Sequence, residues 1–287
     1  MEIKHMYNYF YGWYLKCQSD TQTLAVIPAI HKTENKRTCS IQVITDNDVW
    51  TVVFDADSFR RTKKNIFIGE NQFGEKGIHL AIHTPQLTIM GKLNFGTLFP
   101  LKYDIMGPFA LVPFMQCRHS VRSMRHSVRG NVCINGKKYS FQNNAWGYWE
   151  GDRGWSFPKE YIWTQCCFPG GSVMLSVADI PMAGIHFTGI IGVILWQGKE
   201  YRIATYLGAR VVRIQNKMVR VIQGNLELDV RQLEASGRPL KAPVRGNMVR
   251  TIHESASCRA FYRFRKDGCT LFAFETDRAS FEFEYFS

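Results

Sequence analysis

The sequence has no hydrophobic run long enough to cross a membrane as a helix. Its longest apolar stretch, around Phe187 to Trp196, is about half of the roughly 20 residues that a membrane helix needs, and Gly189 and Gly192 interrupt it. A role with lipids would therefore be that of a soluble or peripheral protein. With 287 residues, 45% of them hydrophobic, the chain is long enough for one large or two ordinary domains.

The eight cysteines include no CxxC pair, and no secretory signal precedes them. This pattern favours reduced thiols and a cytoplasmic location. Cys166 and Cys167 are adjacent, and adjacent residues of a strand face opposite ways, so the two are poorly placed to share a metal ion. We expect no metal site.

Several enzyme signatures are also missing. The chain has no GxSxG elbow, no GxxxxGK[ST] phosphate loop and no GxGxxG between a strand and a helix, which disfavours hydrolases, kinases and dehydrogenases. His79 and His83 have the spacing of HExxH but lack its glutamate, which disfavours a metalloprotease. No signature of an RNA-binding module is apparent, so no nucleic-acid partner is expected.

Positive charge is in excess. Thirty-six Lys and Arg against 24 Asp and Glu give a net charge of +12. Such a surface favours acidic partners, including phosphates and the anionic head groups of a membrane surface, to which the protein would bind peripherally. The oligomeric state does not follow from the sequence.

Alternation of apolar and polar residues dominates the chain. Phe281, Phe283 and Tyr285 alternate with glutamates, and the segment from Leu226 to Arg231 alternates in the same way. Asn135-Gly136, Asp267-Gly268 and, more weakly, Gln197-Gly198 separate such segments and predict tight hairpin turns. Because capped helical periodicity is hard to find, we expect an all-β protein whose antiparallel strands close or nearly close into barrels.

A domain boundary is expected near residue 115. The segment from Thr97 to Pro113 contains Pro100, Pro108 and Pro113, each of which restricts ladder hydrogen bonding. The segment is therefore the best candidate for a connection between two halves. The predicted domains are residues 1–115 and residues 116–287.

The most informative segment runs from Trp146 to Trp163, WGYWEGDRGWSFPKEYIW, with seven aromatics and three carboxylates in 18 residues. Rigid rings beside a few acids are typical of an apolar pocket with polar groups, although a pair of core strands would also contain them. In a strand, one face would carry Trp146, Tyr148, Glu150 and Asp152, and Trp149 would point to the opposite face. A second run places Tyr161, Trp163 and Gln165 on one face, and the two runs are predicted to pair.

This segment closely resembles the signature of the tocopherol cyclase-like family. In that family Gly-Tyr-x-Glu-x-Asp/Asn-x-Gly precedes Ser/Gly-Phe-Pro and then Trp-x-Gln, which here are Gly147 to Gly154, Ser156 to Pro158 and Trp163 to Gln165. Further segments resemble the family across most of the chain: GWYLK (12–16), AVIPAI (25–30), MGPFALVPFMQCRHSVRSMRHSVRG (106–130), SVMLSVADIP (172–181) and YRIATYLGA (201–209).

The resemblance implies two packed lipocalin-like antiparallel β-barrels, with the signature in the second, and a fold shared with carotenoid hydratase-like proteins. Plant members of the family close the chromanol ring of tocopherols. The start of this chain is not typical of a plastid transit peptide, so a bacterial-type member is expected. The substrate would be an apolar or prenylated small molecule.

Chromanol-type cyclisation protonates an alkene, and a phenol oxygen captures the cation. It needs a proton donor, an aromatic wall and exclusion of water, but no redox cofactor. A carboxyl group among rings keeps its proton at neutral pH because desolvation disfavours its charged form. Asp152 or Glu150 would be this acid, and electron-rich rings would stabilise the cation. The candidate wall and binding residues are Trp146, Tyr148, Trp155, Tyr161, Trp163 and Gln165.

A second group of candidates lies in RHSVRSMRHSVRG, residues 118–130. Arg118, His119 and His126, with three further arginines, would bind a phosphate or another acidic group of the substrate, or would form a solvated strand face. His119 or His126 would alternatively act as a base toward a phenol, since histidine titrates near neutral pH.

Two hypotheses follow, and they belong to different classes of function. The first is a cofactor-independent enzyme that cyclises or hydrates a prenylated or isoprenoid compound with Asp152 or Glu150 as acid. The second is a lipocalin-like carrier that binds an apolar molecule without altering it and needs no acid.

Overall fold

Almost all of the regular secondary structure in the described chain is β-strand. The computed structural model describes residues 8–113, 115–182, 184–234, 237–244 and 246–285. In these ranges the strands form two large antiparallel sheets, and the only helices are three short 3₁₀ turns, η2 (Ala56–Ser58), η3 (Gly107–Leu111) and η4 (Thr205–Leu207). The expected all-β antiparallel fold class is confirmed.

The first sheet has 12 strands in the order β4-β3-β2-β1-β12-β10-β9-β8-β7-β6-β5, with β11 paired to β10. Their bounds are β1 (Tyr9–Gln18), β2 (Thr23–Lys32), β3 (Arg37–Thr45), β4 (Val49–Asp55), β5 (Phe59–Arg61), β6 (Asn65–Ile68), β7 (Asn71–Gly74), β8 (Gly77–Thr84), β9 (Leu87–Phe95), β10 (Cys117–Ile134), β11 (Lys137–Phe141) and β12 (Trp146–Gly154).

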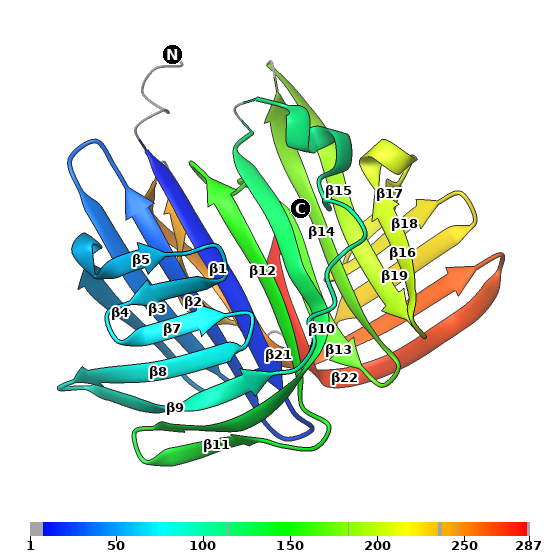
Figure 1. The fold of residues 1–287 in the computed structure, drawn as a ribbon. Coiled ribbons are helices and arrows are strands. Elements are labelled where there is room, and N and C mark those ends of the chain that lie inside the picture. The colour runs from blue at the N-terminus through cyan, green and yellow to red at the C-terminus, as the bar shows by residue number, and fades with distance from the viewer. Residues whose placement is uncertain (1–7, 114, 183, 235–236, 245, 286–287) are drawn as a thin grey trace. The chain divides into compact units, whose positions relative to one another are not determined.

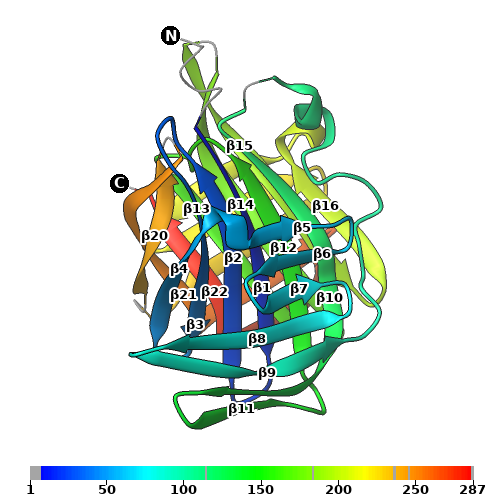
Figure 2. The ribbon, with the colours of Figure 1, turned by 60° about the vertical axis from the view of Figure 1, so that its left-hand side comes forward.

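This sheet curls around one hydrophobic core. Figures 1 and 2 show β5 to β9 crossing in front of β1 to β4. The core between them takes side chains from both parts, among them Leu15, Ile41, Phe73, Leu80 and Trp149, all buried. Burial of such side chains is the main force that holds the curled sheet together.

The second sheet has 10 strands in the order β16-β15-β14-β13-β22-β21-β19-β18-β17, with β20 paired to β21. Their bounds are β13 (Tyr161–Phe168), β14 (Gly171–Met182), β15 (Ile185–Trp196), β16 (Lys199–Ala204), β17 (Arg210–Gln215), β18 (Met218–Gln223), β19 (Leu226–Gln232), β20 (Arg238–Val244), β21 (Asn247–Lys266) and β22 (Cys269–Glu284). It has a core of its own, which includes Ile162, Leu175, Ile194, Tyr262 and Phe281.

A side-chain amide links β16, at one end of the second sheet, to β18, which lies next to the strand at the other end. Gln223 on β18 accepts a hydrogen bond from the Ala204 N–H at 2.9 Å, and its Nε2 donates to the Arg202 carbonyl at 2.9 Å, both on β16. The amide thus replaces a missing ladder partner for two backbone groups, which are costly to leave unpaired when buried.

Gln223→Ala is therefore expected to destabilise the protein by about 1–3 kcal/mol, because two part-buried backbone groups lose their partner. The midpoint of urea unfolding measures this effect. Gln215→Ala is the matched control, since Gln215 is exposed and is expected to change stability by less than about 0.5 kcal/mol. Equal midpoints for the two variants would contradict the role of Gln223.

The three predicted hairpin turns are confirmed. Asn135-Gly136 joins β10 to β11, Gln197-Gly198 joins β15 to β16, and Asp267-Gly268 joins β21 to β22. In each turn both residues have positive φ, for example 47° and 82° at Asn135 and Gly136. This backbone matches the twist of the flanking strands, and Asn, Asp and Gly adopt it most readily.

By their contacts the residues divide into two compact units, each built from several stretches of chain. The first is Met1–Lys102, Cys117–Phe157 and Lys241–Arg250, and the second is Tyr103–Gln116, Pro158–Leu240 and Thr251–Ser287. The predicted division into residues 1–115 and 116–287 differs from this one. The reason is that β10, β11 and β12 belong to the first sheet, in which β12 pairs with β1 and β10 pairs with β9.

The segment from Trp146 to Trp163 is consequently shared between the units. β12 pairs with β1 and β10, while β13 pairs with β14 and β22. The predicted pairing of the two runs with each other is wrong. Short apolar strands of this kind pair equally well with several partners, and remote strands decided the outcome.

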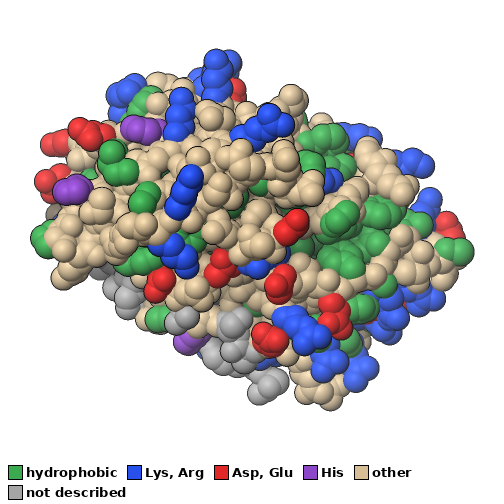
Figure 3. All heavy atoms as spheres, turned by 90° about the horizontal axis from the view of Figure 1, so that it is seen from below, with side chains coloured by type: hydrophobic (Ala, Val, Ile, Leu, Met, Phe, Trp, Pro, Cys, Tyr) green, Lys and Arg blue, Asp and Glu red, His purple; other side chains and the backbone are tan. Residues whose placement is uncertain are grey.

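Among the described residues no helix is long and apolar enough to span a membrane. Lys and Arg side chains are distributed over much of the face in Figure 3, with Asp and Glu between them. Binding to an anionic membrane surface and the cytoplasmic location both stay predictions.

Candidate functional site

Strand β12 presents its acids and its central tryptophan on opposite faces, as the period of two predicts. On one face the Tyr148 hydroxyl donates a short hydrogen bond to Oε2 of Glu150. On the other, Trp149 belongs to the core of the first unit. Gly151 leaves room for a second ring on that face, since a Cβ there would lie 3.0 Å from Cδ1 of Trp13.

Strand β10 brings a histidine to the acids. It pairs with β12 so that His119 lies opposite Asp152 and Val121 lies opposite Glu150. Nδ1 of His119 is 2.8 Å from Oδ1 of Asp152, and Nε2 is 3.0 Å from Oε2 of Glu150. The first contact is a hydrogen bond, whereas Nε2 meets Glu150 at ion-pair distance without hydrogen-bond alignment. One imidazole thus bridges two carboxylates.

The burial of this cluster determines which of its acids keeps a proton. Glu150 is 4% exposed and His119 is 9% exposed, while the Asp152 side chain is 23% exposed. Burial raises the pKa of Glu150 above its ordinary value, and the nearby Asp152 carboxylate adds to the rise, although the ion pair with His119 opposes it. Glu150 is therefore the better placed of the two acids to keep a proton.

His119 is held as a cation. Burial by itself lowers the pKa of His119, but attraction by Glu150 and Asp152 outweighs it, and the pKa is raised well above its ordinary value. Arg153 is exposed and follows Asp152 along the strand. It is not among the charges that shift the pKa of His119 or of Glu150. The cluster can store a proton and pass it between two buried groups.

Cys117 extends the cluster, and no feature of the sequence singled it out. Its Sγ donates to Oδ1 of Asp152 at 3.6 Å. Desolvation raises the pKa of the thiol well above its ordinary value, and the Asp152 carboxylate contributes to the same shift. Cys117 is thus kept as a neutral donor to Asp152 rather than as a reactive thiolate.

The same three residues could hold a metal ion. One ligand atom from each of His119, Glu150 and Asp152 lies within 4.8 Å of the others. Both ring nitrogens of His119 already face a carboxylate, however, so a metal ion would have to displace one of these contacts. The geometry fits a proton relay more directly than a metal centre.

The other candidates of the first unit lie away from this cluster. Trp146 is at the far end of β12, where the Arg125 guanidinium lies 3.5 Å from the centroid of its ring. Arg118 lies opposite Arg153 in the ladder of β10 and β12. It is next to His119 along the strand, so its side chain faces the other side of the sheet. Trp155 follows the end of β12, and its carbonyl accepts a hydrogen bond from Gly246.

His126 has a separate environment. It is 2% exposed, packs beside the Phe95 ring at 4.3 Å, and makes a hydrogen bond through Nδ1 to Ser123 at 3.0 Å. Burial lowers the pKa of His126 to about 3, so the ring is neutral at physiological pH. Gly147 leaves space for it, because a Cβ there would lie 2.2 Å from its Nε2. His126 does not join a cationic phosphate site with Arg118 and His119.

Tyr161, Trp163 and Gln165 lie on β13 in the second unit and are all buried. The Tyr161 hydroxyl donates a short hydrogen bond to Glu282 on β22, and Gln165 donates to Sγ of Cys167 at 3.4 Å. Both hydrogen bonds lie within the second unit.

Comparison with known proteins shows the fold. No protein-family model matches the chain, and no curated protein matches it in sequence. Among solved structures, CghA with Sch210972 has a TM-score of 0.63 at 9% identity and covers 97% of this chain and 89% of its own. Kievitone hydratase from Nectria haematococca has a TM-score of 0.60 at 8% identity, with 96% and 89% covered. The resemblance to the tocopherol cyclase-like family stays a prediction.

Proposed function

We propose that this protein catalyses a cofactor-independent addition of O–H across a carbon–carbon double bond, as a cyclisation or a hydration. The observation that carries the proposal is the bridge of His119 between Glu150 and Asp152, in which a buried carboxyl group has a raised pKa and lies beside a cationic imidazole. In this scheme Glu150 is the acid, His119 resupplies the proton, and Asp152 orients His119.

The reaction balances without a redox cofactor. Glu150 gives its proton to one alkene carbon, so a C–H bond forms, the π bond breaks and the neighbouring carbon becomes cationic. The oxygen of a phenol or of water then forms the C–O bond and loses its own proton. His119, 3.0 Å from Glu150, returns a proton to that carboxylate and takes up the one released from oxygen. The net reaction neither gains nor loses a proton.

Two further points support this class of reaction. Kievitone hydratase, which shares the fold, is named for a hydration. The resemblance of the sequence to tocopherol cyclase-like proteins favours a prenylated or isoprenoid substrate, and the aromatic Tyr148 beside the acid fits an apolar reactant. The carrier hypothesis, by contrast, gives no role to a buried acid that is paired with a cationic histidine.

Deuterium labelling tests the proposal. The purified protein is incubated in D₂O with a panel of prenylated phenols and with an extract of its host, and products are analysed by mass spectrometry. Protonation of an alkene carbon leaves one deuterium that does not wash out in H₂O. Glu150→Gln is expected to lower the yield of labelled product by about 10²–10⁴-fold, the usual contribution of a general acid.

Glu34→Gln is the matched control, since Glu34 lies exposed on the turn between β2 and β3 and the chemical change is the same. It should retain the activity of the unaltered protein. A compound that is retained by the protein and recovered unlabelled and unchanged, equally with Glu150→Gln, would favour the carrier and contradict the enzyme.

A further inference from the structure

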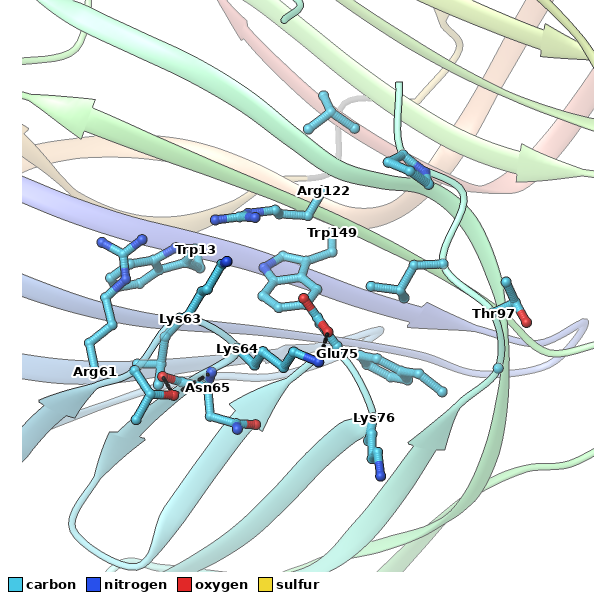
Figure 4. A pocket seen from close by; sticks show the side chains of 17 residues that line it. Trp13, Arg61, Lys63, Lys64, Asn65, Glu75, Lys76, Thr97, Arg122 and Trp149 are labelled. Atoms are coloured by element: carbon cyan, nitrogen blue, oxygen red, sulfur yellow. Dashed lines mark hydrogen bonds and ion pairs between the residues drawn. The ribbon is translucent and has the colours of Figure 1, made fainter. Parts of the chain in front are cut away.

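A cavity of about 600 Å³ opens on the face of β12 opposite the cluster of His119, Glu150 and Asp152. All the residues that line it belong to the first unit. Trp13, Phe95 and Trp149 give it an aromatic floor. Figure 4 shows the rings of Trp13 and Trp149. Its volume is within the range of about 300–1,000 Å³ that is usual for small-molecule sites.

The rim of this cavity is strongly basic. Of the described residues that line it, five are cations and one is an acid, Glu75, whose carboxylate lies 3.9 Å from Nζ of Lys64. The cations come from three separate parts of the sheet. These are Arg61 at the end of β5 with Lys63 and Lys64 in the turn to β6, Lys76 before β8, and Arg122 on β10. Such a rim attracts an anion and repels a cation.

The side chain of Arg61 is held in place by contacts within the protein. The Arg61 guanidinium lies 4.6 Å from the centroid of the Tyr11 ring and 5.2 Å from that of Trp13, and it donates to the Tyr11 hydroxyl at 3.2 Å. Stacking on two rings restricts the side chain, so less conformational entropy is lost when a ligand binds.

A buried donor on the floor has no partner. Trp149 is 4% exposed, and its indole Nε1 makes no hydrogen bond in the described part of the chain. An unpaired buried donor destabilises the folded protein, and an indole N–H can only donate. In Figure 4 the ring of Trp149 and the ends of Lys63 and Arg122 face the same part of the cavity. An oxygen atom placed there would satisfy the indole and meet the cations together.

We infer that this cavity binds a small organic anion, with a carboxylate that accepts a hydrogen bond from Trp149 and pairs with the basic rim. Its apolar, ring-containing body would pack on Trp13 and Phe95, which is the part of the ligand that an aromatic floor selects. The site uses none of the groups of the proposed relay, and the inference does not depend on the proposed function.

Two probes of the same shape test the inference. 2-Naphthoate and its uncharged analogue 2-naphthamide are titrated into the full-length protein by isothermal calorimetry. 2-Naphthoate is expected to bind at one site and at least 10-fold more tightly than the amide, since only the anion pairs with the rim. Equal affinities, or no binding of 2-naphthoate at millimolar concentration, would overturn the assignment.

Variants at exposed positions locate the site without endangering the fold. Arg122→Gln and Lys63→Gln are each expected to weaken 2-naphthoate binding several-fold and to leave 2-naphthamide unchanged. Lys92→Gln, an exposed lysine of β9 outside the cavity, is the control and should bind both probes normally. An equal loss in all three variants would show a nonspecific effect of net charge and would overturn the site.

The indole proton gives an independent readout. In ¹H–¹⁵N spectra of protein labelled at tryptophan, the Trp149 side-chain signal is expected to shift and to exchange more slowly with solvent when 2-naphthoate saturates the site. Trp149→Phe identifies the signal. A signal that stays unchanged at saturation would overturn the role of Trp149 as the donor.

Discussion

The free energy of unfolding is expected to fall as the pH rises above about 6.5, the ordinary pKa of histidine, because the folded protein holds a proton on His119 that the unfolded chain releases. For each extra proton that the folded state binds, the free energy of unfolding falls by about 1.4 kcal/mol per unit rise in pH. Urea unfolding monitored by tryptophan fluorescence between pH 6 and 9 measures this slope.

The direction follows from the raised pKa values. The contribution of His119 is fully present below pH 6.5 and is lost as the pH rises through the folded pKa. Glu150 acts in the same direction, since its folded pKa is also raised: its contribution is present below its ordinary value of 4.5 and is lost as the pH rises through the folded value. Both groups therefore make the protein less stable in alkali.

The double substitution His119→Gln with Glu150→Gln isolates the effect, because glutamine does not titrate and retains hydrogen-bonding groups. In this variant, most of the fall in the free energy of unfolding above pH 6.5 is expected to disappear. His79→Gln is the control, since His79 is exposed on β8 of the same unit, and it should retain the slope. A slope that survives the double substitution would show that His119 does not carry the extra proton.

Gly130→Ala is expected to destabilise the first unit by about 3 kcal/mol or more. Gly130 has a φ of +136°, and a Cβ would lie 2.1 Å from the carbonyl oxygen of Lys92 on β9. Strained backbone alone costs about 1–3 kcal/mol. Overpacking adds about 1–3 kcal/mol, and here the contacted atom is backbone of a paired strand. The shift in the urea midpoint measures the loss.

Gly136→Ala separates strain from crowding. Gly136 also has positive φ, +82°, but nothing lies within 4 Å of its added Cβ. The expected cost is about 1–2 kcal/mol, the usual penalty for a left-handed residue with a side chain. If both variants lost the same stability, the close approach of β9 to β10 would not be the cause.

The two faces of β12 give the protein two chemically different regions. Tyr148, Glu150 and Asp152 face one side with His119, and Trp149 faces the other toward the cavity with the basic rim. Adjacent residues of one strand thus belong to a proposed proton relay and to a proposed anion site. A substitution in one region is expected to leave the chemistry of the other intact, which makes the two proposals separately testable.

Local patterns in the sequence determined the strands, several turns and the faces of β12. Alternation has a period of two in any strand, so Tyr148, Glu150 and Asp152 had to share a face whatever the partner strands were. Asn135-Gly136 specified its turn because both residues tolerate positive φ. These features depend only on neighbours along the chain.

Only the tertiary structure decided which strands meet. His119 and Asp152 come together because β10 pairs with β12 in one register, and a shift by one residue would turn His119 to the other face. In the same way Trp13, Arg61 and Trp149 reach one cavity from remote parts of the first sheet. Strand pairing is selected by the burial of whole faces, a property of many distant residues together, and the short apolar runs of this sequence do not specify it by themselves.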